Sequence, residues 1–202
     1  EIKDKVAGLV SHIQISSFLP EGLSDYNATI KQVRDSIPQV TGISPYVQRE
    51  GVIRYKENIE GILLKGIEQK TDLSTTRNRI LKGEFNLEKI DTIFSRLLVG
   101  EKLANKLGLN VGTKVIVFGL QGIPSPMNPP KIKQFIVSGI YETGLREYDD
   151  VLIYTDLATT QKLFDYGDRV TGIELKVSNI DEVENITSKL RRMLDYPHFP
   201  KS

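Results

Sequence analysis

Few side chains of this sequence have the types and spacing that catalysis or metal binding needs. The chain has two histidines, His12 and His198, and no cysteine. An isolated histidine is more often a packed or solvated side chain than a metal ligand or a general base. We therefore expect no metal and no catalytic role at either position, and we expect the Tyr-Pro-His-Phe-Pro segment around His198 to be flexible. The lack of cysteine excludes disulfides, thiolate zinc sites and a cysteine nucleophile within this sequence.

Two glycines, Gly61 and Gly66, have the spacing of a phosphate-binding loop. Such a loop needs a lysine and a serine or threonine directly after the second glycine, whereas Ile67 and Glu68 stand there. The pattern therefore predicts glycines within a strand and not a nucleotide site. The motifs of serine hydrolases and of zinc proteases are also absent from the sequence.

A small acidic cluster contains Glu147, Asp149 and Asp150, next to Arg146. A calcium loop needs more oxygen ligands at alternating positions than this cluster supplies. We predict a polar turn between two strands, and we expect no cofactor.

The overall composition restricts the class of protein. Lysine and arginine number 27 and aspartate and glutamate 26, so the net charge of +1 gives no reason to expect a nucleic-acid partner. No run approaches the roughly 18 apolar residues of a membrane span. No signal-peptide pattern is present, and the sequence starts almost directly on a strand-like run. We expect a soluble part of a longer protein in preference to a mature exported one.

The terminal parts of the chain show clear periodicities. Alternation predicts a strand over 7–18, and a helix follows from a cap at Ser24 or Asp25 to Pro38. A hairpin is predicted with strands at 51–55 and 61–67 and a turn at 56–58. A strand at 170–177 precedes a helix that begins at a capping box of Ser178 and Asp181. The apolar face expected for this helix consists of Ile180, Val183, Ile186, Leu190 and Met193.

The middle of the chain is less regular. We expect a short polar helix over 73–81 within irregular chain, and then a helix over 100–107 that ends at Gly108 in a left-handed cap. Strands are predicted at 113–118, 132–141 and 151–154. A helix capped by Thr155 or Asp156 then runs to about Phe164.

This order of elements predicts an α+β fold built as a discontinuous plan. We expect one subdomain from 1–70 and 166–202, interrupted by an inserted, mixed and β-rich subdomain over 71–165.

The segment 119–131 is rich in proline, with four of the nine prolines of the chain between 124 and 130. Proline cannot donate to a sheet ladder, so the segment is expected to form the tip of a long hairpin between two strands. A loop stiffened by proline loses little conformational entropy on binding. The alternatives are an idle loop and a projecting element that recognises another protein.

Several segments resemble the periplasmic domains of lipoprotein-releasing ABC-transporter permeases of the LolC and LolE type, and the wider MacB-like periplasmic core. The resemblance lies in the opening Ser-His-Ile-Gln-Ile and in the helix–turn–strand segment 98–115. It continues in 135–141, in Glu147-Tyr-Asp149, and in the strand and helix from 151 to 164.

The resemblance implies a region between the first two of four membrane helices, so that this chain is a periplasmic domain of an inner-membrane protein. The terminal parts would form a porter-like α/β subdomain, without a catalytic centre. Two permease chains, this one and a second subunit or copy, would assemble with a LolD-like dimer of cytoplasmic ATPases. ATP hydrolysis there would drive the release of lipoprotein cargo from the inner membrane.

The resemblance also gives the loop 120–131 a role, because it matches the place of a hook that captures the periplasmic carrier LolA in LolC-type chains. The partner-binding residues would then be Ile123, Pro124, Pro126, Met127, Pro129 and Pro130. The chain is LolC-like on this basis, or belongs to a single permease that performs both tasks.

Two other interpretations remain open at this point. One is a MacB-like or FtsX-like permease domain for efflux or mechanical signalling that binds a periplasmic adaptor. The other is a secreted binding protein or hydrolase that belongs to no permease.

Overall fold

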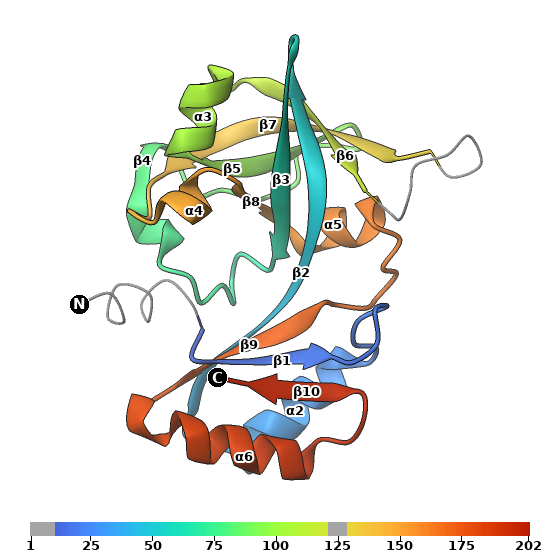
Figure 1. The fold of residues 1–202 in the computed structure, drawn as a ribbon, viewed down its shortest axis with the longest axis vertical. Helices are drawn as coiled ribbons and strands as arrows, with labels where there is room; N and C mark the ends of the chain where they lie inside the picture. The colour runs from blue at the N-terminus through green and yellow to red at the C-terminus, as the bar shows by residue number, and fades with distance from the viewer. Residues whose placement is uncertain (1–10, 121–128) are drawn as a thin grey trace. The chain divides into compact units, whose positions relative to one another are not determined.

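The computed structural model describes residues 11–120 and 129–202, which fold into two units (Figure 1). Within the described chain, unit 1 comprises 11–46, 70–75 and 166–202, and unit 2 comprises 47–69 and 76–165. The fold is α+β, as the order of elements predicted. Residues 47–69 lie in unit 2, whereas the sequence had placed them with the terminal parts. The reason is strand β2 (Val40–Tyr55), whose first half pairs in unit 1 and whose second half pairs in unit 2.

Unit 1 is an antiparallel sheet in the order β10–β1–β9–β2. Its strands besides β2 are β1 (Ile13–Ser17), β9 (Gly172–Val177) and β10 (His198–Lys201). Helices α2 (Tyr26–Ser36) and α6 (Val183–Met193) lie on one side of this sheet (Figure 1). The alternation that predicted the first strand is confirmed where it is described, since Ile13 and Ile15 are both fully buried.

The C-terminal segment around His198 is not the flexible tail that the sequence suggested. It forms β10, which pairs with β1 from Gln14↔Lys201 to Ser17↔His198. The His198 ring hydrogen-bonds through Nε2 to Thr29 Oγ1 at 2.9 Å. His12 lies just before β1, and its Nδ1 accepts a hydrogen bond from the Val177 backbone N–H at 3.1 Å. Both rings therefore help to hold the backbone of unit 1.

Helix α6 begins differently from the prediction. The cap is Asn179, whose side chain accepts from the Asp181 backbone N–H at 3.0 Å, and not a box of Ser178 and Asp181. A 3₁₀ turn, η2 (Ile180–Glu182), precedes the helix, and its three residues per turn shift the phase of the apolar pattern. Ile180 is therefore exposed, and the side chains that α6 buries are Ile186, Thr187 and Leu190.

Unit 2 is a mixed sheet in the order β2–β3–β8–β5–β7–β4, and β6 pairs with both β2 and β7. The pairings β2–β3–β8–β5–β7–β6–β2 therefore form a closed ring, which leaves β4 as an added strand beside β7. The strands besides β2 are β3 (Asn58–Ile67), β4 (Ile80–Gly83), β5 (Phe94–Gly100), β6 (Lys114–Gly119), β7 (Lys131–Tyr141) and β8 (Leu152–Asp156).

The described residues of unit 2 contain three short α-helices. They are α3 (Glu101–Leu107), α4 (Arg146–Asp149) and α5 (Leu157–Leu163). Two predicted caps are confirmed. Gly108 has φ 70° at the end of α3, and Asp156 accepts from the Thr159 backbone N–H at 2.8 Å at the start of α5. Among the described residues, no helix is long and apolar enough to cross a membrane.

The polar helix predicted over 73–81 is wrong. Residues 70–75 belong to unit 1, where Leu73 packs against Gly42. A 3₁₀ turn, η1 (Thr76–Arg79), and strand β4 follow instead. Strand β5 was not predicted either, although Leu97, Leu98 and Val99 are fully buried. A continuous apolar run is typical of a strand that is covered on both faces, and it shows no alternation.

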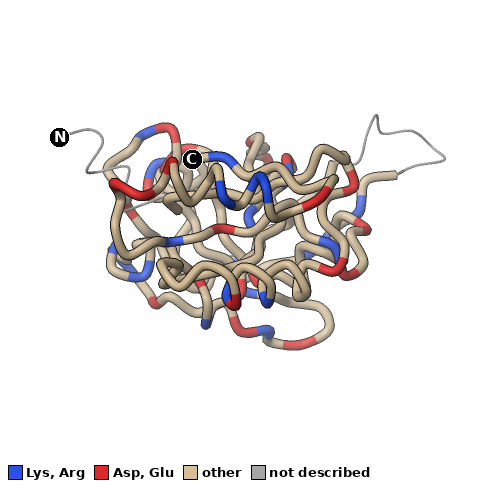
Figure 2. Tube along the Cα trace, turned by 90° about the horizontal axis from the view of Figure 1, so that it is seen from below, with Lys and Arg blue, Asp and Glu red and all other residues tan. Residues whose placement is uncertain are grey.

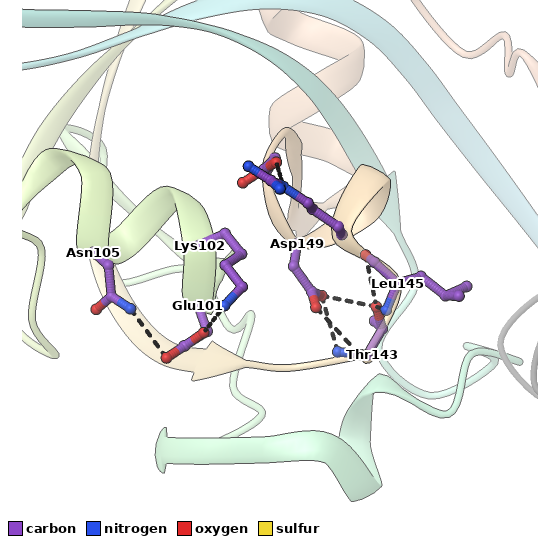
Figure 3. Close-up of polar contacts among 9 residues, drawn as sticks. Glu101, Lys102, Asn105, Thr143, Leu145 and Asp149 are labelled. Carbon is purple, nitrogen blue, oxygen red and sulfur yellow. Dashed lines mark hydrogen bonds and ion pairs between the residues drawn. The ribbon is translucent and has the colours of Figure 1, made fainter.

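The acidic cluster lies between two strands, β7 and β8, as predicted, but it forms the short helix α4 and its C-cap Asp150 and not a turn. One of its members, Asp149, is structural (Figure 3). Asp149 is buried and accepts hydrogen bonds from Thr143 N at 2.9 Å, Thr143 Oγ1 at 2.8 Å and Gly144 N at 3.2 Å. Gly100 lies against the same residue, since a Cβ atom at Gly100 would come within 2.3 Å of the Asp149 carbonyl oxygen. These contacts join the segment around α3 to the segment after β7. Among the described residues, no group of three or more metal-ligating side chains is found.

Gly66 is needed because β3 packs closely on α5, and not because it binds a phosphate. A Cβ atom there would lie 2.2 Å from Thr160 Oγ1 and 2.5 Å from Thr160 Cβ, whereas Gly61 has open space around it. We expect Gly66→Ala to lower the free energy of unfolding by about 1–3 kcal/mol through overpacking. Gly61→Ala is the matched control and should leave it nearly unchanged. Denaturant titration measures both, and equal stabilities of the two variants would contradict this packing.

The Asp149 carboxylate provides a second test. We expect Asp149→Asn to destabilise the protein by about 1–3 kcal/mol, because the amide NH₂ group would face backbone and hydroxyl donors in a buried turn. Asp150→Asn is the control. It removes only the exposed ion pair with Arg146, which is worth less than about 1 kcal/mol. Thermal and denaturant unfolding of both variants would show the difference, and a stable Asp149→Asn protein would refute the structural role.

Candidate partner-docking hairpin

The loop that the sequence singled out leaves the sheet between β6 and β7. These strands are paired from Lys114↔Ile136 to Gly119↔Lys131, so the chain departs directly after Gly119 and returns at Lys131. Pro129 is exposed and Pro130 is half-buried, and both lie outside the strands. The other predicted partner-binding residues, Ile123, Pro124, Pro126 and Met127, lie outside the described residues. The structure therefore describes the root of the hairpin and not its tip.

The root of the hairpin is held on both sides. Strand β6 pairs with β2 from Arg54↔Ile116 to Gly51↔Gly119, in addition to its pairing with β7. A Cβ atom at Gly51 would lie 2.9 Å from the Phe118 carbonyl oxygen. A Cβ atom at Gly119 would lie 3.0 Å from Leu163, at the end of α5. The two glycines thus allow three backbone segments to approach closely at the point where the loop begins.

Lysines gather on one side of this root. A hollow of about 290 Å³ is lined by Lys89, Thr92, Lys131, Ile132, Lys133, Thr159, Lys162 and Leu163. Lys133 donates to the Thr92 carbonyl oxygen at 3.1 Å, and Lys131 forms an exposed ion pair with Asp165. Burial lowers the pKa of Lys133, and the nearby Lys89 lowers it further. We call this group of residues the lysine hollow.

A second, wider hollow lies along β2 and β6. Its volume is about 600 Å³, and its lining is Arg54, Tyr55, Lys56, Glu57, Ile59, Lys114, Val115, Ile116 and Gln134. The guanidinium of Arg54 lies 5.5 Å from the Phe118 ring centroid, and the Lys114 ammonium lies 4.8 Å from that of Phe94. These cation–π contacts hold two cations beside the strands that carry the loop.

Cationic and apolar side chains both lie at the root of the hairpin. Exposed apolar side chains, Leu120 and Ile132, lie at this root together with the cations of the lysine hollow. This arrangement suits an acidic protein surface with apolar contacts. Figure 2 shows that the two signs of charge are interspersed along the described chain.

Sequence reasoning missed the lysines of the root. The sequence contains one local sign of them. Lys131 and Lys133 alternate along β7, so both lie on one face of the strand and Ile132 lies on the other. Lys89 and Lys162 are distant in sequence and join them only in the folded chain.

Comparison with known proteins finds relatives that match nearly the whole chain. The profile of the MacB-like periplasmic core domain matches residues 2–193. A "Lipoprotein-releasing system transmembrane protein LolC" of Xylella fastidiosa is 28% identical over 203 residues, 98% of this chain. The LolC protein of Neisseria meningitidis is 24% identical over 193 residues, and a LolE protein of Haemophilus influenzae is 23% identical over 204. This chain spans 46–47% of the length of these three relatives.

Two solved structures have a similar fold. One is the extracellular domain of the noncanonic ABC-type transporter YknZ from Gram-positive bacteria. Its TM-score is 0.60 at 13% identity, and the match covers 94% of this chain and 99% of that one. The periplasmic region of MacB from Actinobacillus actinomycetemcomitans has a TM-score of 0.58 at 14% identity, with 98% and 91% covered. The profile match over nearly the whole sequence shows that the chain belongs to the family of MacB-like periplasmic core domains.

Proposed function

We propose that this chain is the extracytoplasmic domain of a LolC-like ABC-transporter permease of the inner membrane. In this proposal the permease releases lipoproteins from the membrane, and a periplasmic carrier docks on the loop 120–131 to receive them. The observation that carries the proposal is the β6–β7 hairpin, whose loop leaves a root fixed on both sides. The LolC relatives, similar over 94–98% of the chain, give the transport system in which such a hairpin would act.

The fixed root supports docking on energetic grounds. A free loop of this length loses conformational entropy when it is ordered by a partner, and that loss weakens binding. Here both ends of the loop continue directly into paired strands at Gly119↔Lys131, and Pro129 and Pro130 restrict the backbone next to that pair. Less of the binding free energy from the tip would therefore be lost in ordering the loop.

The charge of the root indicates the chemistry of the partner. The lysine hollow places cations next to Lys131, where the loop returns, and the second hollow adds cations farther along β6, around Lys114. A carrier with an acidic rim around an apolar groove would complement this surface. Charge complementarity of this kind mainly speeds association and selects the partner.

The domain itself would not hydrolyse ATP. A LolD-like dimer of cytoplasmic ATPases would supply the energy through the full-length protein. A second permease subunit or copy would complete the transporter. The lipoprotein cargo would then pass to the carrier outside the membrane.

The tip of the loop is tested by a Pro126→Ala/Met127→Ala variant of the full-length permease. We expect the affinity for a LolA-like carrier to fall at least about tenfold, since central anchors dominate interface energy. Pro38→Ala, an exposed proline after α2 in unit 1, is the control and should bind like the wild type. Pull-down followed by calorimetry measures both. Unchanged binding of the double variant would refute docking on this loop.

The lysine hollow is tested by charge reversal at Lys162, an exposed residue of α5. We expect Lys162→Glu to slow association with the carrier, most strongly at low ionic strength where charges are least screened. Lys82→Glu on β4, also exposed and in the same unit, is the control for net charge. Stopped-flow association rates at two salt concentrations give the result. An equal effect of both substitutions would show that the hollow has no specific role.

A further inference from the structure

Unit 1 exposes a cluster of aromatic side chains that no part of the proposed docking surface uses. Phe18 stacks on Tyr196 with ring centroids 6.2 Å apart and contacts Phe199 at 4.7 Å. Phe18 is 60% exposed, Tyr196 71% and Phe199 38%, and the neighbouring Leu19 is 39% exposed. We call these four residues the aromatic cluster. Large exposed apolar groups that contact one another mark an interaction surface more often than scattered ones do.

The backbone holds the aromatic cluster in a fixed geometry. Ser17 pairs with His198 at the end of the β1–β10 ladder, and the Phe18 N–H donates to the Pro197 carbonyl oxygen at 2.9 Å. The His198 N–H donates to the Asp195 carbonyl oxygen at 3.0 Å, which closes the turn that carries Tyr196. The His198 ring is bound in turn to Thr29 at 2.9 Å. The rings are therefore presented by paired backbone and not by a free tail.

The same ladder shows where the chain leaves unit 1. Gln14 pairs with Lys201, so the segments before β1 and after β10 depart from the same end of these two strands. The aromatic cluster lies at the other end, about four residues away, which is roughly 13 Å along a strand. In the proposed function, the chain before residue 1 and after residue 202 continues into membrane-spanning segments. With β1 and β10 lying along the bilayer surface, both tethers would then hold the aromatic cluster within reach of it.

We propose that the aromatic cluster rests in the interfacial layer of the lipid bilayer that the flanking segments enter. This inference rests on the proposed function. Tyrosine is enriched at membrane interfaces because its ring is apolar and its hydroxyl can remain hydrated. Phe18, Phe199 and Leu19 would supply the apolar area that enters the boundary between headgroups and acyl chains. Lys201, exposed on the same strand as Phe199, can reach lipid phosphates.

The two flanking tethers favour the bilayer over a separate protein as the binding partner of the aromatic cluster. Four side chains bury too little apolar surface to hold a free domain on a membrane by themselves. A double covalent tether raises the effective concentration of the bilayer at the aromatic cluster, so a weak contact suffices. Such a contact would orient unit 1 against the membrane without fixing it irreversibly.

The test uses the full-length protein in phospholipid vesicles, with a single cysteine that carries a bimane fluorophore. This part of the chain has no cysteine of its own, and any others are replaced by serine. The probe is placed by Tyr196→Cys, and separately by Lys31→Cys on α2, where the lysine side chain is 79% exposed. We expect doxyl-labelled lipids to quench the Tyr196 probe severalfold more than the Lys31 probe. Aqueous iodide should show the opposite order.

Three results would overturn the inference, and they separate it from the proposed function. Iodide quenching at Tyr196 equal to that at Lys31, in a protein that inserts and still binds the carrier, would refute the membrane contact alone. Cross-linking between Tyr196→Cys residues of two chains would show a second copy as the occupant and would also refute it. A full-length protein that resists insertion into vesicles would refute both proposals. Carrier binding by the Tyr196→Cys protein verifies that the variant is folded.

Discussion

Strand β7 is hydrogen-bonded along both of its edges, and the geometry of unit 2 depends on this. One edge pairs in parallel with β5 from Gln134 to Tyr141. The other edge pairs first with β6 up to Ile136 and then with β4 from Gly139. Between these two ladders, Val137 exchanges hydrogen bonds with Gly112 and Thr113 at 2.8 and 3.0 Å. The backbone of β7 is therefore satisfied on both sides along most of its length.

The far end of β7 is anchored as firmly as its start. Tyr141 is buried, and its hydroxyl donates to the Leu152 carbonyl oxygen at 2.6 Å. Burial raises the pKa of Tyr141 well above its usual value, so the phenol stays protonated and remains a donor. Since a strand paired on both edges cannot slide without breaking two ladders, Lys131 holds a fixed position where the loop returns. The point at which the chain re-enters the sheet is therefore fixed by the pairing of β7.

Local sequence signals predicted much of this fold, because helix caps, turns and alternating strands depend on residues that are close together in the sequence. Gly108 ends α3 since a left-handed cap needs a residue without a Cβ atom, and Asp156 starts α5 since its carboxylate reaches a free N–H. The hairpin of β2 and β3 and the strands on either side of the proline-rich loop were predicted for the same reason. The elements that were missed depend on distant partners. β10 forms only because β1 offers it an edge, and β4 only because β7 does.

The division of β2 has the same cause. Its 16 residues form one continuous strand, and nothing in their order marks the change of partner from β9 to β6. The candidate site, too, could be predicted only in part from the sequence. The proline-rich loop could be found from composition, whereas the lysine hollow could not, because Lys89 and Lys162 join β7 only after the sheet has closed.

The hairpin root and the aromatic cluster share one structural feature. In each, two antiparallel strands are paired up to their last residues, Gly119↔Lys131 in one case and Ser17↔His198 in the other. Candidate contact residues follow directly beyond that final pair, among them Phe18 and Tyr196, while Phe199 pairs with Ser16 inside the ladder. Backbone hydrogen bonds then supply the order that a binding surface would otherwise have to create on contact, and the side chains remain free to be apolar or charged. Composition alone therefore indicates which residues could bind, but the register of the strands decides which of them are held ready to do so.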